Sequence, residues 1–124
     1  MADENSLLYT KEHEWLKVEE GCAYVGITNY AQSELGDIIF VEFPEIGDIF
    51  SSNDVFGTIE AVKTVADLYI PVDGEIVEIN DSLESEPEKI NKEPYDGGWI
   101  VKIKLKNEDD LKDLLSLDEY KKII

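Results

Sequence analysis

The sequence contains few of the residues on which catalysis and disulfide frameworks depend. Cys22 is the only cysteine, which excludes an intrachain disulfide and favours a reducing compartment, so we interpret it as a strand residue. His13 is the only histidine, and we assign no acid–base role to a lone histidine between two glutamates. There is no glycine-rich phosphate loop, no Cys/His cluster with metal-ligand spacing and no Gly-x-Ser-x-Gly elbow. The sequence therefore lacks the parts of a free-standing enzyme.

Basic residues are also scarce, with 11 Lys and Arg against 29 Asp and Glu and a formal net charge of -18. A surface of this charge repels nucleic acid and anionic membranes, so neither class of partner is expected. The acidity favours solubility, and it also suits steering toward basic docking faces on partner enzymes.

Long apolar runs and targeting signals are missing as well. No apolar stretch approaches the roughly 20 residues of a membrane span. Residues 1–5 are acidic and lack both the basic start of a signal peptide and the Arg-rich pattern of a transit peptide. We therefore expect a cytoplasmic protein, or a mitochondrial matrix protein if the chain is a processed eukaryotic one.

What is present suits one globular domain. The chain has 124 residues, of which 43% are hydrophobic, and this is enough to build a core without disulfide or metal staples. We predict a single domain over residues 1–124, with residues 1–6 flexible, residues 107–124 forming a helical cover, and a monomeric state.

Short β-prone segments dominate the pattern. Residues 22–28 and 37–43 are typical of strands, and residues 99–105 alternate between an apolar and a mostly basic face. The motif Pro-x-x-Gly-acid follows a strand at residues 44–48 and again at residues 71–75, which suggests two related β-units facing each other across one core. We predict a mainly β fold shaped as a flattened barrel.

Helices are expected at three places. Residues 29–35 predict a short helix with Thr28 or Asn29 as its N-cap. Residues 80–98 contain two prolines and predict a long surface excursion with one helical turn. After Asn107 a capped helix with a buried stripe is expected, followed by a second short helix with a Ser/Glu capping box; the stripe is Leu111, Leu114 and Leu115, and the box is Ser116 with Glu119.

The segment 57–77 contains two β-prone runs around one lysine, which places Lys63 near the tip of a predicted hairpin. Most lysines at such positions serve only solubility. The run EAVKT at residues 60–64, followed by ADLYIPVDG at residues 66–74, resembles the swinging-arm hairpin of biotinyl and lipoyl carrier domains. Biotin carriers place Met on both sides of the lysine, whereas Val62 and Thr64 stand here, so the pentapeptide alone leaves the cofactor open.

Five further motifs narrow the resemblance. They are YTKEHEW at residues 9–15, VGITNYAQ at 25–32, LGDIIFVEFP at 35–44, EPEKIN at 86–91 and PYDGGW at 94–99. In this order, and over nearly the whole chain, the sequence is similar to the glycine cleavage H-protein family, which carries lipoate. The resemblance implies a lipoyl-domain-like hammerhead, that is, a flattened barrel-sandwich hybrid.

The resemblance implies roles for the hairpin residues. Lys63 matches the lysine that receives lipoate in amide linkage, and Glu60 and Val62 match positions read by the lipoylating enzyme. Two neighbours depart from the family pattern, because Ala61 stands where the family usually has Ser and Thr64 stands where it usually has Ala.

Three residues outside the hairpin tip also match functional positions. Glu14 and Asp67 correspond to acidic positions that hold the loaded arm in a surface cleft, and Ile27 corresponds to part of its apolar wall. The loaded arm ends in a primary amine, and a pair of carboxylates offsets its charge.

The implied function is a shuttle between enzymes. The arm would accept an aminomethyl group from a pyridoxal-phosphate glycine decarboxylase (P protein). It would then pass the methylene to tetrahydrofolate at an aminomethyltransferase (T protein) and be reoxidised by dihydrolipoamide dehydrogenase (L protein). A lipoate ligase or lipoyltransferase would attach the cofactor. The alternatives are a lipoate donor for other complexes, a biotin carrier and, from another class, a free-standing enzyme.

Overall fold

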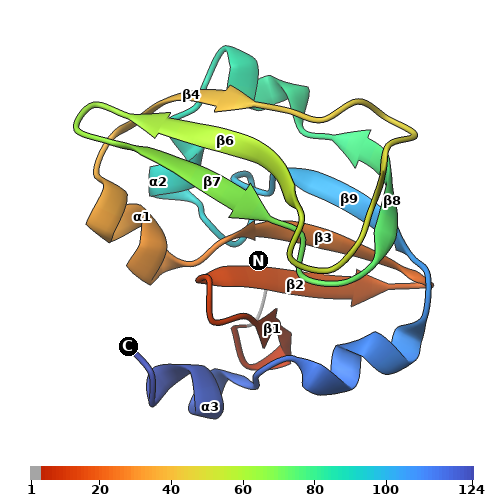
Figure 1. Cartoon of the computed structure of the whole chain (residues 1–124). Coiled ribbons are helices and arrows are strands. Elements are labelled where there is room, and N and C mark those ends of the chain that lie inside the picture. Colours follow the sequence, from red (N-terminus) through yellow and green to blue (C-terminus); the bar gives the residue numbers. More distant parts are fainter. Residues whose placement is uncertain (1–3) are drawn as a thin grey trace.

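Residues 4–124 are described by the computed structural model, and they form two antiparallel sheets flanked by short helices (Figure 1). The larger sheet has six strands in the order β1-β2-β3-β9-β8-β5, and the smaller has three in the order β4-β6-β7. The strands of the larger sheet are β1 Leu8–Tyr9, β2 Glu14–Glu19, β3 Cys22–Ile27, β5 Ile49–Phe50, β8 Gly74–Ile79 and β9 Val101–Leu105. Those of the smaller sheet are β4 Ile38–Glu42, β6 Val55–Ala61 and β7 Val65–Tyr69. The prediction of a mainly β fold is confirmed.

The helices are short and lie between and after the strands. The α-helices are α1 Asn29–Leu35, α2 Lys89–Lys92 and α3 Leu117–Lys121, and the 3-10 helices are η1 Glu4–Ser6, η2 Asp81–Glu84 and η3 Glu108–Asp113. The Thr28 side chain caps α1 by accepting a hydrogen bond from the Ala31 amide, as its residue type predicts. Within residues 4–124, no helix has the length and apolar character needed to cross a membrane.

The main core fills the space between the two sheets. Strand alternation turns Val25 of β3 and Ile103 of β9 inward from the larger sheet, and Ile59 of β6 and Leu68 of β7 inward from the smaller one. All four side chains are buried, and burying apolar surface of this kind is the main stabilising contribution to a fold without disulfides.

The two sheets do not close into the barrel that the sequence predicted. The outer edges of the smaller sheet are met by side chains instead of strands. On β4, the Ile38 amide donates to Asn91 Oδ1 at 2.9 Å, and on β7, the Tyr69 amide donates to Glu14 Oε2 at 2.8 Å. Because these edge donors are already used, the arrangement is a sandwich of two separate sheets.

The segment 80–98 is not the surface excursion that its composition suggested. Leu83 of η2 and Ile90 of α2 are both 0% exposed and belong to the main core. Many of its charged residues are exposed, but Pro94 is buried and Pro87 is half-buried, and Leu83 and Ile90 fill one side of the sandwich. The segment therefore covers the core and also supplies the Asn91 side chain that caps β4.

The C-terminal segment packs against β1 (Figure 1). Both predicted caps are present, because Asn107 accepts from the Asp109 amide and Ser116 forms a capping box with Glu119. The first helix is a 3-10 helix, and the leucines expected in a buried stripe are only half-buried. Tyr120 instead anchors the segment in a small second core with Leu7, Tyr9 and Trp15. Of the N-terminal residues predicted to be flexible, 1–3 lie outside the described residues and Glu4–Ser6 form η1.

Candidate functional site

Lys63 lies at the tip of the β6–β7 hairpin, which two backbone hydrogen bonds fasten. The Ala61 amide donates to the Thr64 carbonyl at 2.8 Å and closes the tip, and the Val62 amide donates to the Asp37 carbonyl at 3.0 Å. Lys63 is exposed, and the neighbouring Val62 is 73% exposed. The hairpin therefore presents the lysine from a fixed backbone.

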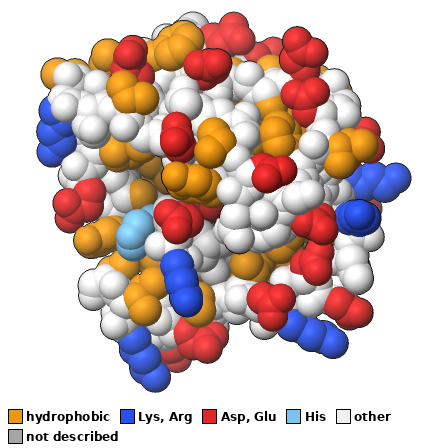
Figure 2. All heavy atoms as spheres, viewed as in Figure 1, with side chains coloured by type: hydrophobic (Ala, Val, Ile, Leu, Met, Phe, Trp, Pro, Cys, Tyr) orange, Lys and Arg blue, Asp and Glu red, His pale blue; other side chains and the backbone are white. Residues whose placement is uncertain are grey.

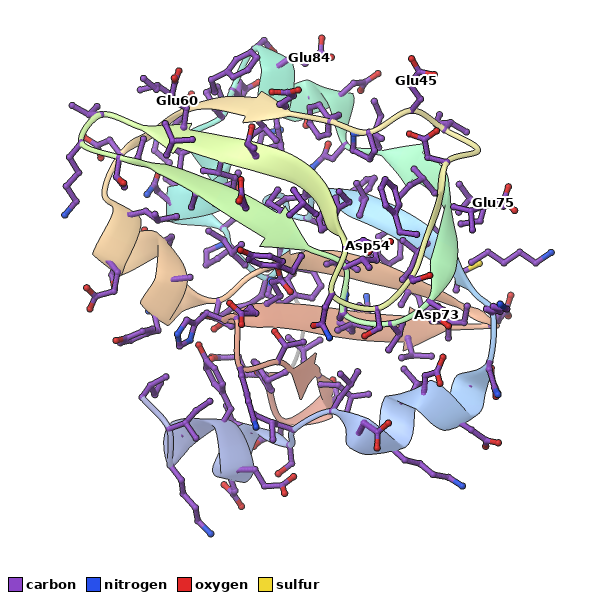
Figure 3. The ribbon with its side chains drawn as sticks, viewed as in Figure 1. Glu45, Asp54, Glu60, Asp73, Glu75 and Glu84 are labelled. Carbon is purple, nitrogen blue, oxygen red and sulfur yellow. The ribbon has the colours of Figure 1, made fainter. Side chains whose placement is uncertain are left out.

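Glu60 and Val62, the residues matched to enzyme recognition, lie on the surface of the same hairpin. Glu60 lies near the end of β6 and projects from the hairpin (Figure 3). Acidic side chains are spread over this side of the molecule (Figure 2), in keeping with the net charge of -18. A partner that binds this hairpin would thus contact an exposed valine and a nearby carboxylate.

The aliphatic part of Lys63 lies against the end of α1. A methyl group built on Gly36 would lie 3.4 Å from Lys63 Cε, which places the lysine stem within van der Waals reach of this residue. Gly36 also has a backbone φ of 81°, which favours glycine and ends α1. An arm extended from Lys63 would accordingly start beside α1.

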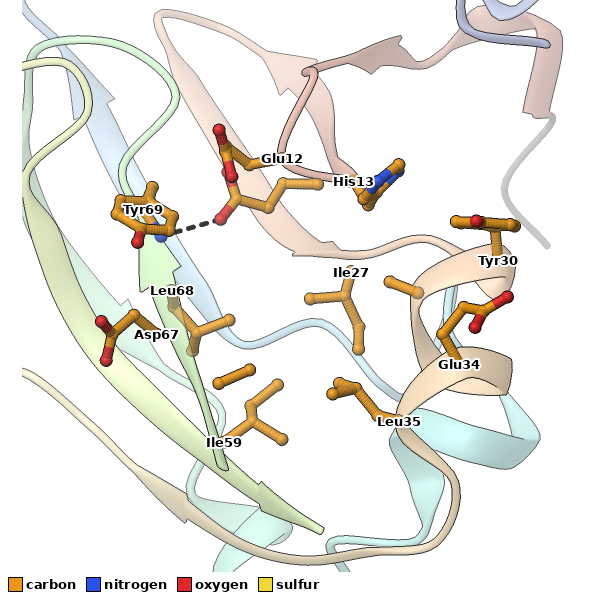
Figure 4. Close-up of a pocket in the computed structure, with 13 residues that line it drawn as sticks. Glu12, His13, Ile27, Tyr30, Glu34, Leu35, Ile59, Asp67, Leu68 and Tyr69 are labelled. Carbon is orange, nitrogen blue, oxygen red and sulfur yellow. Dashed lines mark hydrogen bonds between the residues drawn. The ribbon is translucent and has the colours of Figure 1, made fainter. Parts of the chain in front are cut away.

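Helix α1 forms one wall of a surface cleft of about 430 Å³ (Figure 4). The rest of the lining comes from β6 and β7, from the end of β3, from the first residue of β2 and from the turn that precedes it. The apolar lining residues are Ile27, Ala31, Leu35, Ile59, Ala66 and Leu68, and the acidic ones are Glu12, Glu14, Glu34 and Asp67. The cleft has no lysine or arginine in its lining, so it suits an apolar chain that ends in a cation.

Glu14 is the buried acid of the cleft, with only 2% of its surface exposed. Its Oε2 accepts the Tyr69 amide at 2.8 Å, marked by the dashed line in Figure 4, and its Oε1 accepts the Thr10 hydroxyl at 3.4 Å. Burial raises the pKa of the Glu14 carboxyl to about 8; the nearby Glu12 also raises it, and the Tyr69 hydrogen bond opposes the rise. The carboxyl therefore holds a proton over much of the neutral range, and an arriving cation would favour its release.

The structure brings together three of the six residues matched by the resemblance. Glu14 and Ile27 are cross-strand partners on β2 and β3, and Asp67 lies on β7, where it is labelled in Figure 4. All three line the cleft. Lys63, Glu60 and Val62 lie outside the lining, on the hairpin above it.

Sequence reasoning missed Glu12, Tyr30 and Glu34 as cleft residues. The spacing of the two residues on α1 could have indicated this, because Tyr30 and Glu34 are four residues apart and so share one face of the helix. His13 was assigned no role, yet its ring also lines the cleft and contacts the Tyr30 ring at a centroid distance of 4.9 Å. Across residues 4–124, no group of three or more His, Cys, Asp and Glu is placed to hold a metal ion.

The raised pKa of Glu14 predicts a pH-dependent stability. In the folded chain the carboxyl keeps its proton up to about pH 8, whereas in the unfolded chain it releases it near 4.5. The stabilisation is therefore complete below pH 4.5 and is lost as the pH rises through about 8. We expect the free energy of unfolding of the native chain to fall, relative to a Glu14→Gln variant, by roughly 4 kcal/mol over this interval.

Urea unfolding of both proteins across this pH range measures the difference. The glutamine variant is the matched control because it resembles the protonated carboxyl and does not titrate, while both chains share the repulsion among the other acids. Parallel profiles for the two proteins would contradict the assigned pKa.

The sequence and the fold are both similar to those of known proteins. A family model described as "Glycine cleavage H-protein" matches residues 7–124. The glycine cleavage system H protein of Listeria monocytogenes serotype 4b is 55% identical over 118 residues, covering 95% of this chain and 94% of the relative. That of Staphylococcus haemolyticus is 53% identical over 124 residues, covering 100% and 98%. The crystal structure of a glycine cleavage system H protein from Mycobacterium marinum superposes with a TM-score of 0.83 at 35% identity, covering 94% of each chain. The chain therefore belongs to the glycine cleavage H-protein family.

Proposed function

We propose that this chain is the lipoylated carrier of the glycine cleavage system, with lipoate in amide linkage to Lys63. The observation that supports this most directly is the placement of Lys63. It is an exposed lysine on a fastened hairpin, and its stem lies beside the helix that walls an apolar cleft with a buried carboxyl.

The cleft residues fit a lipoyl arm. Such an arm is a hydrocarbon chain that joins the lysine to a ring. The lysine stem lies against Gly36, which directly follows Leu35, the last residue of α1. From there the apolar side chains of Ile59 and Ile27 line the cleft toward Glu14. Apolar side chains therefore line the path from the attachment point to the buried Glu14 carboxyl at its far end.

Lipoate would supply a disulfide that takes up the aminomethyl group of glycine and is afterwards restored. The residues of this chain would then hold the amine of that load. The Glu14 carboxyl would give up its proton and accept a hydrogen bond from the cation, while Asp67 would add a second negative charge at the cleft. The apolar lining would keep water from the load.

On this proposal the chain carries the reacting group, and the partner enzymes catalyse the reactions. Those partners are the glycine decarboxylase, the aminomethyltransferase and dihydrolipoamide dehydrogenase, together with the enzyme that attaches lipoate. Glu60 and Val62 are exposed beside Lys63, and the enzyme that attaches lipoate would contact them. The relatives named above come from bacteria, which favours the cytoplasm over the mitochondrial matrix.

The proposal predicts a single lipoyl adduct. We expect the intact mass of protein expressed with lipoate and a competent ligase to rise by one lipoyl group, and peptide mapping to place it on Lys63 alone. A biotin adduct would move the chain to another class of carrier. An unmodified lysine under the same conditions would contradict the proposal.

A further inference from the structure

A chain of three polar side chains joins the C-terminal helix to one end of the cleft. Tyr120 Oη of α3 lies 2.8 Å from His13 Nδ1 and 2.8 Å from Thr28 Oγ1. His13 belongs to the turn that precedes β2, and Thr28 is the N-cap of α1. One phenol therefore contacts both of the segments that meet at this end of the cleft.

Tyr120 itself is buried, with 2% of its surface exposed, and it is absent from the cleft lining. Its ring stacks on Tyr9 at a centroid distance of 4.9 Å and an interplanar angle of 9°, which fixes its position. Burial also raises the pKa of the Tyr120 phenol, so that it keeps its proton near neutral pH. It is thus available as a rigid hydrogen-bonding group.

The hydrogen bonds around Tyr120 select an orientation for His13. The Tyr120 hydroxyl has one proton and two acceptor lone pairs, so it can bond to both Thr28 Oγ1 and His13 Nδ1 at once. The bond at Nδ1 fixes the plane of the imidazole in either tautomer.

The fixed position of the His13 ring also affects the cleft that it lines. Its backbone has a left-handed φ of 67°, which is uncommon outside glycine, and its ring lies against Tyr30 of α1 (Figure 4). The next residue is Glu14. Both His13 and Glu14 line the cleft, with the His13 ring toward Tyr30 and the Glu14 carboxyl toward Tyr69 (Figure 4). A His13 ring held in place therefore closes the cleft between the turn and α1.

We propose that Tyr120 is a positioning residue, which holds the His13 ring against α1 and so keeps water away from Glu14 and from a load bound there. The effect on Glu14 is a property of the chain alone. The effect on the load rests on the carrier function proposed above.

The test compares Tyr120→Phe with Tyr9→Phe in the full chain. Both variants lose one hydroxyl from the same stacked pair, but the Tyr9 hydroxyl donates to the Glu4 carbonyl, whereas the Tyr120 hydroxyl contacts His13 and Thr28. In unloaded protein with ¹³C-labelled glutamate, we expect the Glu14 titration to move from about 8 toward 4.5 in Tyr120→Phe and to stay in place in Tyr9→Phe. His13→Asn, which tolerates left-handed backbone but removes the ring, should shift the titration in the same direction.

A second measurement follows the loaded, lipoylated protein. The Tyr120→Phe variant should lose its aminomethyl group roughly threefold to tenfold faster than Tyr9→Phe, which corresponds to the loss of one hydrogen bond. A Glu14 titration that is unchanged in Tyr120→Phe, or shifted equally in Tyr9→Phe, would overturn the proposal. Because the titration needs no lipoate, it gives its answer even if Lys63 proves to be unmodified.

Discussion

Replacing Lys63 with arginine is expected to reduce carrier activity to background while leaving the fold intact. The guanidinium keeps the positive charge and most of the length of the side chain, but it stays protonated and offers no amine for acylation. Lys63 is exposed and lies outside the core, so the substitution should change the free energy of unfolding by less than about 0.5 kcal/mol. Glycine–bicarbonate exchange with the glycine decarboxylase measures the activity, and intact mass measures the adduct.

Lys106→Arg is the matched control, because Lys106 is an exposed lysine just after β9 and far along the chain from the hairpin. This variant should be lipoylated and should support exchange at the native rate. Exchange that persists in Lys63→Arg at the level of Lys106→Arg would remove Lys63 from the proposed function.

Replacing Glu14 with glutamine is expected to shorten the lifetime of the loaded arm by roughly ten- to hundredfold. The amide keeps the size of the side chain and an oxygen that accepts the Tyr69 amide, but it offers no negative charge to the amine of the load. A hydrogen bond to a charged group contributes about 1.5–3 kcal/mol, which gives the expected range. The rate is measured as release of the labelled carbon after loading with glycine labelled at its methylene carbon.

Glu45→Gln supplies the comparison, since Glu45 is an exposed acid in the turn before β5 (Figure 3). It removes the same charge without touching the cleft, and its loaded arm should decay at the native rate. If Glu14→Gln and Glu45→Gln decayed alike, Glu14 would be a structural acid that caps β7 and has no part in holding the load.

The local elements of the fold were predictable where the residues that define them are neighbours in sequence. Helix α1 begins after Thr28 and ends before Gly36 as predicted, because a threonine cap and a glycine stop act within one turn. The hairpin around Lys63 was also predicted from neighbouring residues. The association of Glu14, Ile27 and Asp67 came only from the resemblance, since nothing local links residues on three different strands.

Contacts between distant segments explain what was missed. Composition assigned 80–98 to the surface, yet Leu83 and Ile90 are enough to anchor it in the core, because two fully buried side chains outweigh many exposed charges. The mainly β sandwich is confirmed, but its sheets do not close into a barrel; side chains, including Asn91, meet the sheet edges, and such contacts leave no period in the sequence. The contact of Tyr120 with His13 spans 107 positions, which no pattern of spacing indicates.

The hydrogen bond from the Val62 amide to the Asp37 carbonyl holds the hairpin tip, and this affects how the partner enzymes would share the carrier. With the backbone beneath Lys63 held, the arm has a fixed pivot, and its reach is set by its own covalent length. Every enzyme served by this arm must bring its active site within one radius of the same hairpin. The partners would then compete for a single position, and the order of their visits would be set by their concentrations and by how quickly each one leaves.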